Sequence, residues 1–408
     1  MNAPAPPAPI DLESIRTQFP ILAERIHGKR LAYLDNAATT QKPEAVLQAL
    51  DRYYRTSNAN VHRAVHELAA RATTQYEAAR DRIAAFLNAK REEIVFTRGT
   101  TEAINLVARC FLAPRLQPGD QVLLSGMEHH SDIVPWQLVG AQTVAANVTD
   151  RGELDVDHWK SLLGPKVKLV AIGHVSNTLG TVNPVATLVR EAHARGIPVL
   201  VDGAQAIAHV AVDVAALDVD FYAVSAHKAY GPTGFGALYA KRAHLEAMPP
   251  WHGGGDMIRT VAFGGSTWND VPYKFEAGTP DMAGAIGFAA ALDWIAGVGL
   301  DRIHAHEEAV LADATRELAA IPGVRIIGTA PGKGGILSFV MEGAPAQDLG
   351  SLLDLDGVAI RTGHHCTMPL MERFGIPATA RASFAVYNGN DDVQQLVGAL
   401  HKARRILA

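Results

Sequence analysis

Cysteine is scarce in this sequence, which has two thiols, Cys110 and Cys366, in 408 residues. So few cysteines in a chain of this length argue against a disulfide framework and fit a reducing compartment, so we expect a cytoplasmic location. Blocks of Lys and Arg are also absent, and the net charge is −5 with acidic and basic residues interspersed. This distribution predicts neither a nucleic-acid partner nor binding to an anionic membrane.

Long hydrophobic runs are missing as well, because no apolar run approaches the length of a membrane-spanning helix. The most apolar stretch, AIGFAAALDWIAGVGL, contains Asp293 and several glycines, and this composition indicates a buried helix. The first residues, MNAPAPPAPID, lack the charged and apolar regions of a secretory signal. Their Pro and Ala bias predicts a short disordered leader over residues 1–10.

The middle of the chain alternates short β-rich runs with helix-period stretches. The β-rich runs are EEIVFT, DQVLLSG, VKLVAIGHV, PVLVDG, DFYAVSAH and FGALYA. Near-continuous apolar strands separated by helices predict an α/β fold with a mostly parallel central sheet flanked by helices. In such a sheet, ligands bind beyond the carboxyl ends of the strands.

A smaller α+β domain is predicted after about residue 285, where the pattern changes. A long helical region at about 285–320 precedes GILSFVME and a terminal helix near VQQLVGALHKARRIL. We therefore expect a large domain at 31–285 and a small domain formed by 1–30 and 286–408. The glycine-rich segment GGGDMIRTVAFGGSTWND is predicted to form a hairpin that leaves the large domain.

Two charged residues at predicted strand ends indicate cofactor chemistry. Lys228 follows DFYAVS, where a dry pocket lowers a lysine pKa and permits a Schiff base, although most lysines are solvated surface residues. Asp202 ends the apolar run PVLVD, so its burial requires a cation or a donor. The ring nitrogen of pyridoxal 5′-phosphate (PLP) is such a partner, and a metal ion or a helix N-terminus is the alternative.

Other polar clusters follow the same rule of lying after a strand. The segment Gly99–Glu102 opens a predicted helix, so its N–H groups and hydroxyls make either an anion site or a plain N-cap. No Walker A or GxGxxG signature accompanies it. His129, in SGMEHHSDIVPW, is suited to stack on a cofactor ring or to form hydrogen bonds in the core. Its acidic and histidine neighbours occupy adjacent positions that face different ways, so we predict no metal site.

The sequence also offers a thiol and a carboxylate-binding cation. Cys366 lies in RTGHHC, where Arg361 and two histidines favour the reactive thiolate; the alternatives are an inert core cysteine and a Cys/His metal cluster, although no second Cys lies at metal-motif spacing. Arg381, in ATARASFAVYN, is suited to bidentate capture of an α-carboxylate or to a surface ion pair. Cys110, on an apolar helix, is predicted to pack in the core.

Taken together, these motifs resemble the SufS/CsdA-type (group II) cysteine desulfurases, which are aminotransferase-like, fold-type I PLP enzymes that include selenocysteine lyases. The resemblance spans residues from about 30 to 390. It rests on YLDNAATTQKP, NVHRAVHELA, VFTRGTTEAINLVA, MEHHSDIVPWQ, HVSNTLGTVNP, VDGAQAIAH, SAHKAYGPTGFGALY, PPWHGGGDMI, FEAGTPD, RTGHHCTMPLM and RASFAVYN.

The resemblance implies a role for each matching residue. Lys228 is implied to bind PLP as a Schiff base, with Asp202 on the pyridine nitrogen and His129 stacked on the ring. The other implied cofactor contacts are Gln205 and Asn177 at the ring oxygen, Thr100, Thr101, Ser225 and His227 at the phosphate, and Thr279 at the phosphate of the neighbouring subunit of a homodimer.

On the substrate side, the resemblance implies that Arg381 binds the carboxylate of L-cysteine, with Arg361 and His62 nearby. Cys366 would take the sulfur as a persulfide and release L-alanine, which mobilises sulfur for uses such as iron–sulfur cluster assembly. A SufE- or SufU-like protein is the implied acceptor.

Three other functions compete with this one. A selenocysteine lyase has the same pocket without a strict need for the thiol. An aminotransferase or a kynureninase shares the fold but needs no thiol in the RTGHHC loop. A non-catalytic PLP-binding subunit of a sulfur-transfer complex would need neither Lys228 nor Cys366.

Overall fold

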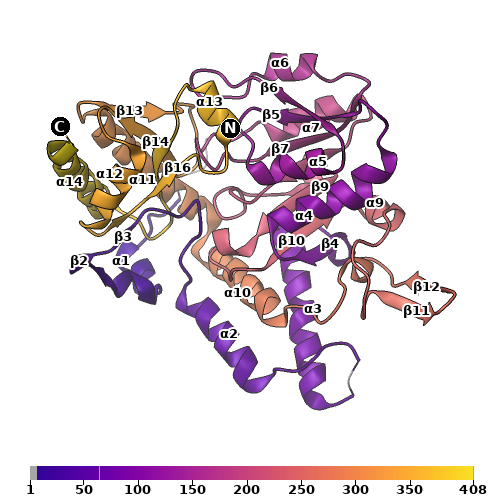
Figure 1. The fold of residues 1–408 in the computed structure, drawn as a ribbon. Coiled ribbons are helices and arrows are strands. Elements are labelled where there is room, and N and C mark those ends of the chain that lie inside the picture. The colour runs from indigo at the N-terminus through magenta and orange to yellow at the C-terminus, as the bar shows by residue number, and fades with distance from the viewer. Residues whose placement is uncertain (1–6, 64, 408) are drawn as a thin grey trace, which may run out of the picture.

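A computed structural model describes residues 7–63 and 65–407, and its centre is a seven-stranded sheet of order β4-β10-β9-β8-β7-β5-β6 (Figure 1). β10 runs antiparallel to both of its neighbours, and every other pair is parallel. The predicted, mostly parallel sheet is therefore confirmed. The strands are β4 (Ile94–Thr97), β5 (Gln121–Ser125), β6 (Gln142–Ala146), β7 (Val167–Gly173), β8 (Val199–Asp202), β9 (Phe221–Ser225) and β10 (Gly236–Ala240).

Apolar side chains on both faces explain why these segments form an interior sheet. In β8, Val199 and Val201 enter the hydrophobic cluster on one face, whereas Leu200 enters the cluster on the other. This two-residue alternation is the pattern of a strand that is covered on both sides. The predicted runs omit β6, because its QTVAA sequence forms a partly exposed edge strand with little branched apolar content.

Helices cover both faces of the sheet. The Val201 face packs against α3 (Glu67–Leu87), α7 (Val185–His193) and α10 (Met282–Val298). The Leu200 face packs against α4 (Thr100–Leu106), the π-helical turn Val107–Leu112, α5 (Val134–Leu138) and α9 (Arg242–Ala247). Cys110 is buried in that π-helical turn, in agreement with its predicted packing role.

A second sheet, of order β13-β14-β17-β16, is antiparallel throughout and lies to the left in Figure 1. Its strands are β13 (Val324–Ile327), β14 (Ile336–Met341), β16 (Arg361–Gly363) and β17 (Thr379–Ser383), packed against α11 (Leu300–Ala319), α12 (Ala346–Asp354) and α14 (Asn390–Leu407). β3 (Ala32–Tyr33) pairs with β15 (Val358–Ala359), so the chain just beyond the predicted boundary at 31 joins this sheet's core. The division into two domains stays a prediction.

Several further elements complete the chain. They are α1 (Leu12–Arg16), α2 (Glu44–Thr56), α6 (Val156–Ser161), α8 (Val214–Leu217), α13 (Met368–Arg373), β1 (Arg25–Ile26) and β2 (Lys29–Arg30). The N-terminal segment DLESIRTQFP contacts the C-terminal helix α14. Arg16 donates to Asp391 and Asp392 of α14 at 2.7 and 2.8 Å. Of the predicted leader, residues 1–6 lie outside the described residues, whereas the carbonyls of Ala8 and Pro9 accept hydrogen bonds from Arg302.

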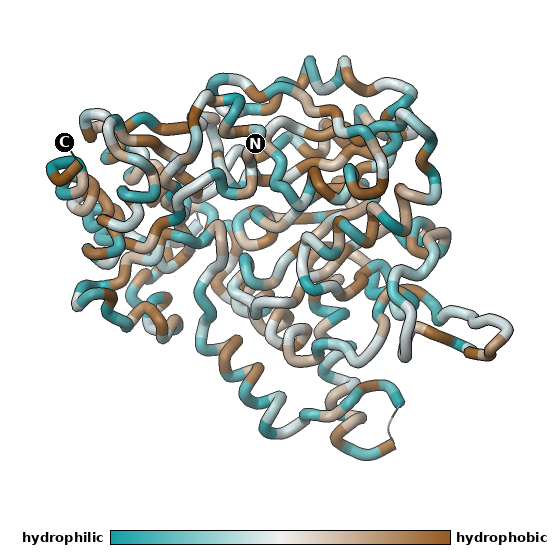
Figure 2. Tube along the Cα trace, viewed as in Figure 1, coloured by the Kyte–Doolittle hydropathy of each residue, from teal (hydrophilic) through white to brown (hydrophobic). Residues whose placement is uncertain are grey.

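The predicted hairpin is present as β11 (Ile258–Ala262) and β12 (Gly265–Trp268), which project from the body of the molecule (Figure 1). Figure 2 shows hydrophobic residues along this projection, where Val261 and Phe263 are exposed. Among the described residues, no single helix is long and apolar enough to cross a membrane; α10 and α11 meet that criterion only as a pair bent by 77°. α10 packs against α2 and α3, as its sequence predicts for a buried helix.

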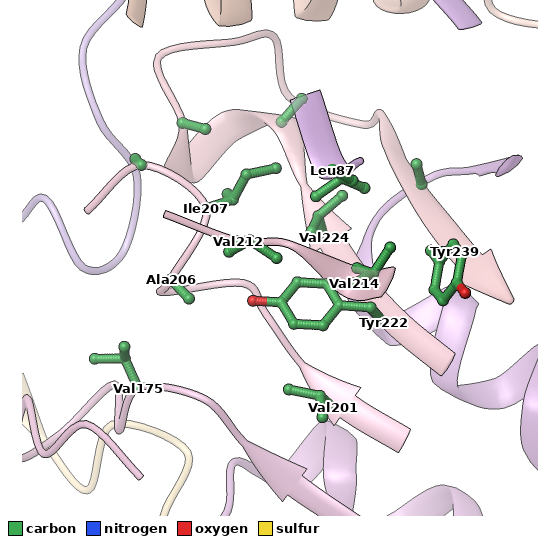
Figure 3. Close-up of a cluster of buried hydrophobic side chains, with 14 of the residues drawn as sticks. Leu87, Val175, Val201, Ala206, Ile207, Val212, Val214, Tyr222, Val224 and Tyr239 are labelled. Atoms are coloured by element: carbon green, nitrogen blue, oxygen red, sulfur yellow. The ribbon is translucent and has the colours of Figure 1, made fainter. Parts of the chain in front are cut away.

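One close approach beside β8 leads to a stability prediction. Tyr222 lies fully buried in the cluster of Figure 3, and a Cβ added to Gly203 would lie 2.0 Å from its Cε1 atom. We expect Gly203→Ala to lower the free energy of unfolding by about 2 kcal/mol or more, because a rigid buried ring has to move.

Gly398, exposed on α14 with nothing within 4 Å of an added Cβ, supplies the control. Gly398→Ala should raise the free energy of unfolding by about 0.5–1 kcal/mol, since it removes a helix glycine. Denaturant titration of both variants measures the difference. Equal stability of the two would contradict the packing account.

Candidate active site

A cavity of about 430 Å³ opens at the carboxyl edge of the large sheet. Ser225 ends β9, Asp202 ends β8 and Gly173 ends β7, and these parallel strands finish at the same edge. Twelve of the predicted site residues line this cavity: Thr100, Thr101, His129, Asn177, Asp202, Gln205, Ser225, His227, Lys228, Arg361, Cys366 and Arg381. The structure therefore brings together residues that are up to 281 positions apart in the sequence, from Thr100 to Arg381.

Lys228 enters the cavity from a single turn of 3-10 helix, Ala226–Lys228, directly after β9. The pKa of Lys228 is lowered to about 8, mainly by loss of water around the amine and also by the nearby Arg381 and Arg361, while Asp202 and Cys366 oppose the shift. A lowered pKa leaves more of the amine unprotonated near neutral pH. The amine is therefore suited to act as a nucleophile or a base.

Asp202 lines the cavity, and its Oδ1 accepts a hydrogen bond from Ala204 N at 2.9 Å. Burial raises the pKa of this carboxyl, and the positive charge of Lys228 opposes the rise. A buried carboxylate is stabilised by a cationic hydrogen-bond donor. The protonated ring nitrogen of PLP is such a donor, so the observed environment fits the group predicted for it.

Hydroxyl groups gather where β4 and β9 end. Ser225 Oγ accepts from Thr100 N at 2.9 Å and donates to Thr100 Oγ1 at 2.9 Å, and Thr101 Oγ1 lies 2.7 Å from Ser131 Oγ. Gly236 permits this arrangement, because a Cβ there would lie 2.6 Å from the Cα of Gly99. A cluster of hydroxyls and backbone N–H groups suits a phosphate. Ser131 was not predicted, although it stands two residues after His129.

His129 is neutral in this site. Burial is the main cause that lowers the pKa of His129 to about 3, and Lys228 adds to the effect. Its Nδ1 accepts from Ser131 N at 3.0 Å, so the proton of the neutral ring is on Nε2. An uncharged imidazole at the cavity wall is suited to pack against a flat ring.

Gln205, another residue that lines the cavity, is held by the backbone, because its Nε2 donates to Ala37 O at 2.6 Å.

Arg381 and Arg361 share one acid. Arg381 donates to Asn177 O at 2.8 Å and to Asp35 Oδ1 at 3.2 Å, and Arg361 donates to Asp35 Oδ2 at 3.1 Å. The Nε of Arg381 is buried and has no hydrogen-bond partner among the described residues. Two guanidinium groups against one carboxylate leave the cavity with capacity for another anion, such as a substrate carboxylate.

Cys366 is exposed on a loop between β16 and α13 and lines the cavity. Asn177 holds this loop, because its Nδ2 donates to His365 O at 2.7 Å. This contact differs from the ring-oxygen contact predicted for Asn177, which stays a prediction. His365 Nε2 lies 2.8 Å from Thr379 Oγ1, and burial lowers the pKa of His365 to about 3. The loop is thus fixed by buried neutral groups beneath the thiol.

The buried acid pair Glu128 and Asp132 was not predicted, because these acidic neighbours of His129 were considered only as metal ligands; Glu128 lines the cavity. Burial is the main cause that raises the pKa of Glu128 to about 7 and that of Asp132 well above its usual range. Glu128 Oε2 accepts from Gly173 N at 2.8 Å. In the described part of the chain, no group of three or more His, Cys, Asp or Glu residues is arranged to hold a metal ion.

Two predicted residues lie apart from the cavity. His62 lines a pocket with Tyr273, and its Nε2 lies 2.8 Å from Glu77 Oε1. Thr279 lines an adjoining pocket with Trp251, and both pockets include Glu276. Within one chain, these two residues do not meet the cluster around Lys228.

Comparisons with known proteins agree with this arrangement. The aminotransferase class-V family model matches residues 32–396. A cysteine desulfurase of Dickeya dadantii is 50% identical, with 100% of each chain covered. The solved structure of the cysteine desulfurase CsdA from Escherichia coli has a TM-score of 0.91 at 42% identity, covering 98% of this chain and 100% of that one. The cysteine desulfurase of Thermococcus onnurineus has a TM-score of 0.93 at 37% identity, with the same coverage.

These matches extend over the whole cavity, whose lining residues run from Ala37 to Arg381. The fold is that of the fold-type I enzymes, as predicted. The chain belongs to the aminotransferase class-V family and, within it, to the group II cysteine desulfurases.

Proposed function

We propose that this cysteine desulfurase acts with PLP bound in the cavity, and that Cys366 receives the sulfur of L-cysteine as a persulfide. The observation that carries the proposal is the presence of Lys228, Asp202 and Cys366 on the walls of one cavity. An aminotransferase has no use for an exposed thiol at this position. A non-catalytic PLP-binding subunit would not require the thiol and the amine together.

The residues of the cavity form two groups, and the first group would hold the cofactor. Lys228 would bind it covalently, Asp202 would keep its ring nitrogen protonated, and His129 would pack on the ring. The hydroxyls of Thr100, Thr101 and Ser225 would hold the phosphate together with His227 and, less directly, Ser131. When bound, PLP supplies an electron sink for the α-carbon of the substrate.

The other residues act on the amino acid. Arg381 would bind the α-carboxylate, which places the α-proton near the Lys228 amine. Once the amino group of the substrate has displaced Lys228 from the cofactor, the freed Lys228 amine would accept that proton and later return one to carbon. The Cys366 thiolate would attack the substrate sulfur, so that an S–S bond forms as the C–S bond breaks. The products are L-alanine and the Cys366 persulfide, and the C–S electron pair stays with the carbon fragment until it is protonated.

A homodimer and a SufE- or SufU-like sulfur acceptor complete the proposal, together with a cytoplasmic location. Support for the dimer comes from Thr279 and His62, which lie outside the chain's own cavity, and from the projecting β11-β12 hairpin with exposed Phe263. A group of exposed apolar side chains on a projecting hairpin, here Val261, Phe263 and Trp268, is typical of a contact surface. In the dimer, Thr279 would approach the phosphate site of the partner subunit.

Removal of the thiol should separate two reactions. Cys366→Ala should lower alanine formation from L-cysteine by about a hundredfold or more, because sulfide is a poor leaving group without a nucleophile. With L-selenocysteine, whose selenol ionises more readily, alanine formation should persist. Cys110→Ala is the control and should keep desulfuration, since Cys110 is buried away from the cavity. Unchanged desulfuration in Cys366→Ala would refute the persulfide route.

The carboxylate of Asp202 should matter through its charge. Asp202→Asn should keep the fold and bind PLP, yet lose about a hundredfold or more in alanine formation, because an amide cannot hold the ring nitrogen protonated. Cofactor absorbance and alanine assays measure the two effects. Asp348→Asn, at an exposed position on α12, serves as the control and should be neutral. Near-normal turnover of Asp202→Asn would leave Asp202 with a structural role.

The oligomeric state tests the role of Thr279. Light scattering should give twice the 43.5 kDa mass of the chain. Thr279→Val should remain dimeric but bind PLP more weakly, since it removes one phosphate contact. A monomer with full activity would contradict both the dimer and the shared phosphate site.

A further inference from the structure

The loop that carries Cys366 has an unfavourable backbone. His365 and Cys366 have φ angles of +52° and +59°, and both carry side chains. Consecutive left-handed residues of this kind are rare, because the Cβ atom crowds the backbone. Contacts from outside the loop are therefore needed to keep Cys366 in place.

Contacts reach the loop from two sides. On the buried side, Asn177 holds His365, and Thr178 Oγ1 lies 2.9 Å from Thr367 Oγ1. On the exposed side, His130 N donates to Cys366 O at 2.8 Å, and Met368 N donates to His130 Nε2 at 3.1 Å. His130 is therefore hydrogen-bonded to the loop at Cys366 through its backbone and at Met368 through its ring.

We propose that His130 is a positioning residue that keeps Cys366 at the cavity by accepting the Met368 N–H group on its ring. This inference rests on the proposed role of Cys366 in taking up sulfur. The ring has to be neutral to accept a hydrogen bond at Nε2. Burial and the neighbouring His364, whose ring centre is 5.5 Å away, lower the pKa of His130 and favour that state.

The two hydrogen bonds of His130 respond differently to substitution. The bond from its backbone N–H to Cys366 survives any replacement except proline. The bond from Met368 to the ring is lost in His130→Ala. In His130→Gln, the amide oxygen reaches to the position of Nε2 and again offers an acceptor. The ring contact is therefore open to a direct test without disturbing the rest of the loop.

The test is steady-state alanine formation by the PLP-loaded enzyme with L-cysteine and with L-selenocysteine. His130→Ala should lower kcat for L-cysteine by about tenfold with little change in KM, because thiol attack requires Cys366 in place. The reaction with L-selenocysteine, which needs no thiol, should stay within about twofold of wild type. His130→Gln should restore kcat for L-cysteine to within about threefold of wild type.

His158→Ala is a matched control, because His158 Nδ1 also accepts a backbone N–H, from Asn147 at 3.0 Å, far along the chain from the loop. It should leave both reactions unchanged. Wild-type kcat in His130→Ala, an equal loss with both substrates, or no recovery in His130→Gln would each overturn the inference. If Cys366→Ala kept full desulfuration, the proposed function would fail instead, which separates the two outcomes.

Discussion

The hydrogen-bonded register of β4, β10, β9 and β8 is the constraint on which the site depends. Gly236 of β10 stands opposite Ser225 on one side and Thr97 on the other. A Cβ at Gly236 would lie 2.4 Å from Val224 O, so this register and the glycine require each other. The same ladder continues through β9 to β8 and places the end of β8, at Asp202, beside Ala223. A slip of one residue would reverse every side chain across these strands.

The charge state of the cavity follows from burial. His129 is kept neutral by loss of water, and Lys228 loses part of its positive charge for the same reason. Arg381 keeps its charge, because its pKa falls only to about 10 through burial and Asp35 opposes that fall. A neutral imidazole (His129), a partly unprotonated amine (Lys228) and a charged guanidinium (Arg381) therefore line the same cavity. Burial lowers the pKa of all three groups, and their different ordinary pKa values of 6.5, 10.5 and 12.5 decide which of them keeps its charge.

Much of this arrangement could be predicted from the sequence, because strands with continuous apolar side chains end in polar residues. Lys228 and Asp202 were found in this way, since Asp202 ends such a strand and Lys228 lies three residues after another. Contacts between distant loops could not be predicted, because they leave no periodic pattern in the sequence. The bond from Asn177 to the Cys366 loop joins residues 188 positions apart, and nothing in either segment specifies the other. The edge strand β6 was missed for a related reason, because partial exposure relaxes its composition.

The pairing of Arg381 with Asp35 also bears on how a product leaves. If Arg381 binds the α-carboxylate of the amino acid, the substrate would share this guanidinium with Asp35, which already accepts a hydrogen bond from it. The free energy gained by the substrate carboxylate would then be reduced by the ion pair that Asp35 already makes, which would lower the affinity for the amino acid. Alanine carries the same carboxylate as cysteine and lacks the sulfur. If Arg381 has that role, Asp35 would compete with the carboxylate of alanine for the same guanidinium, which would favour release of the product.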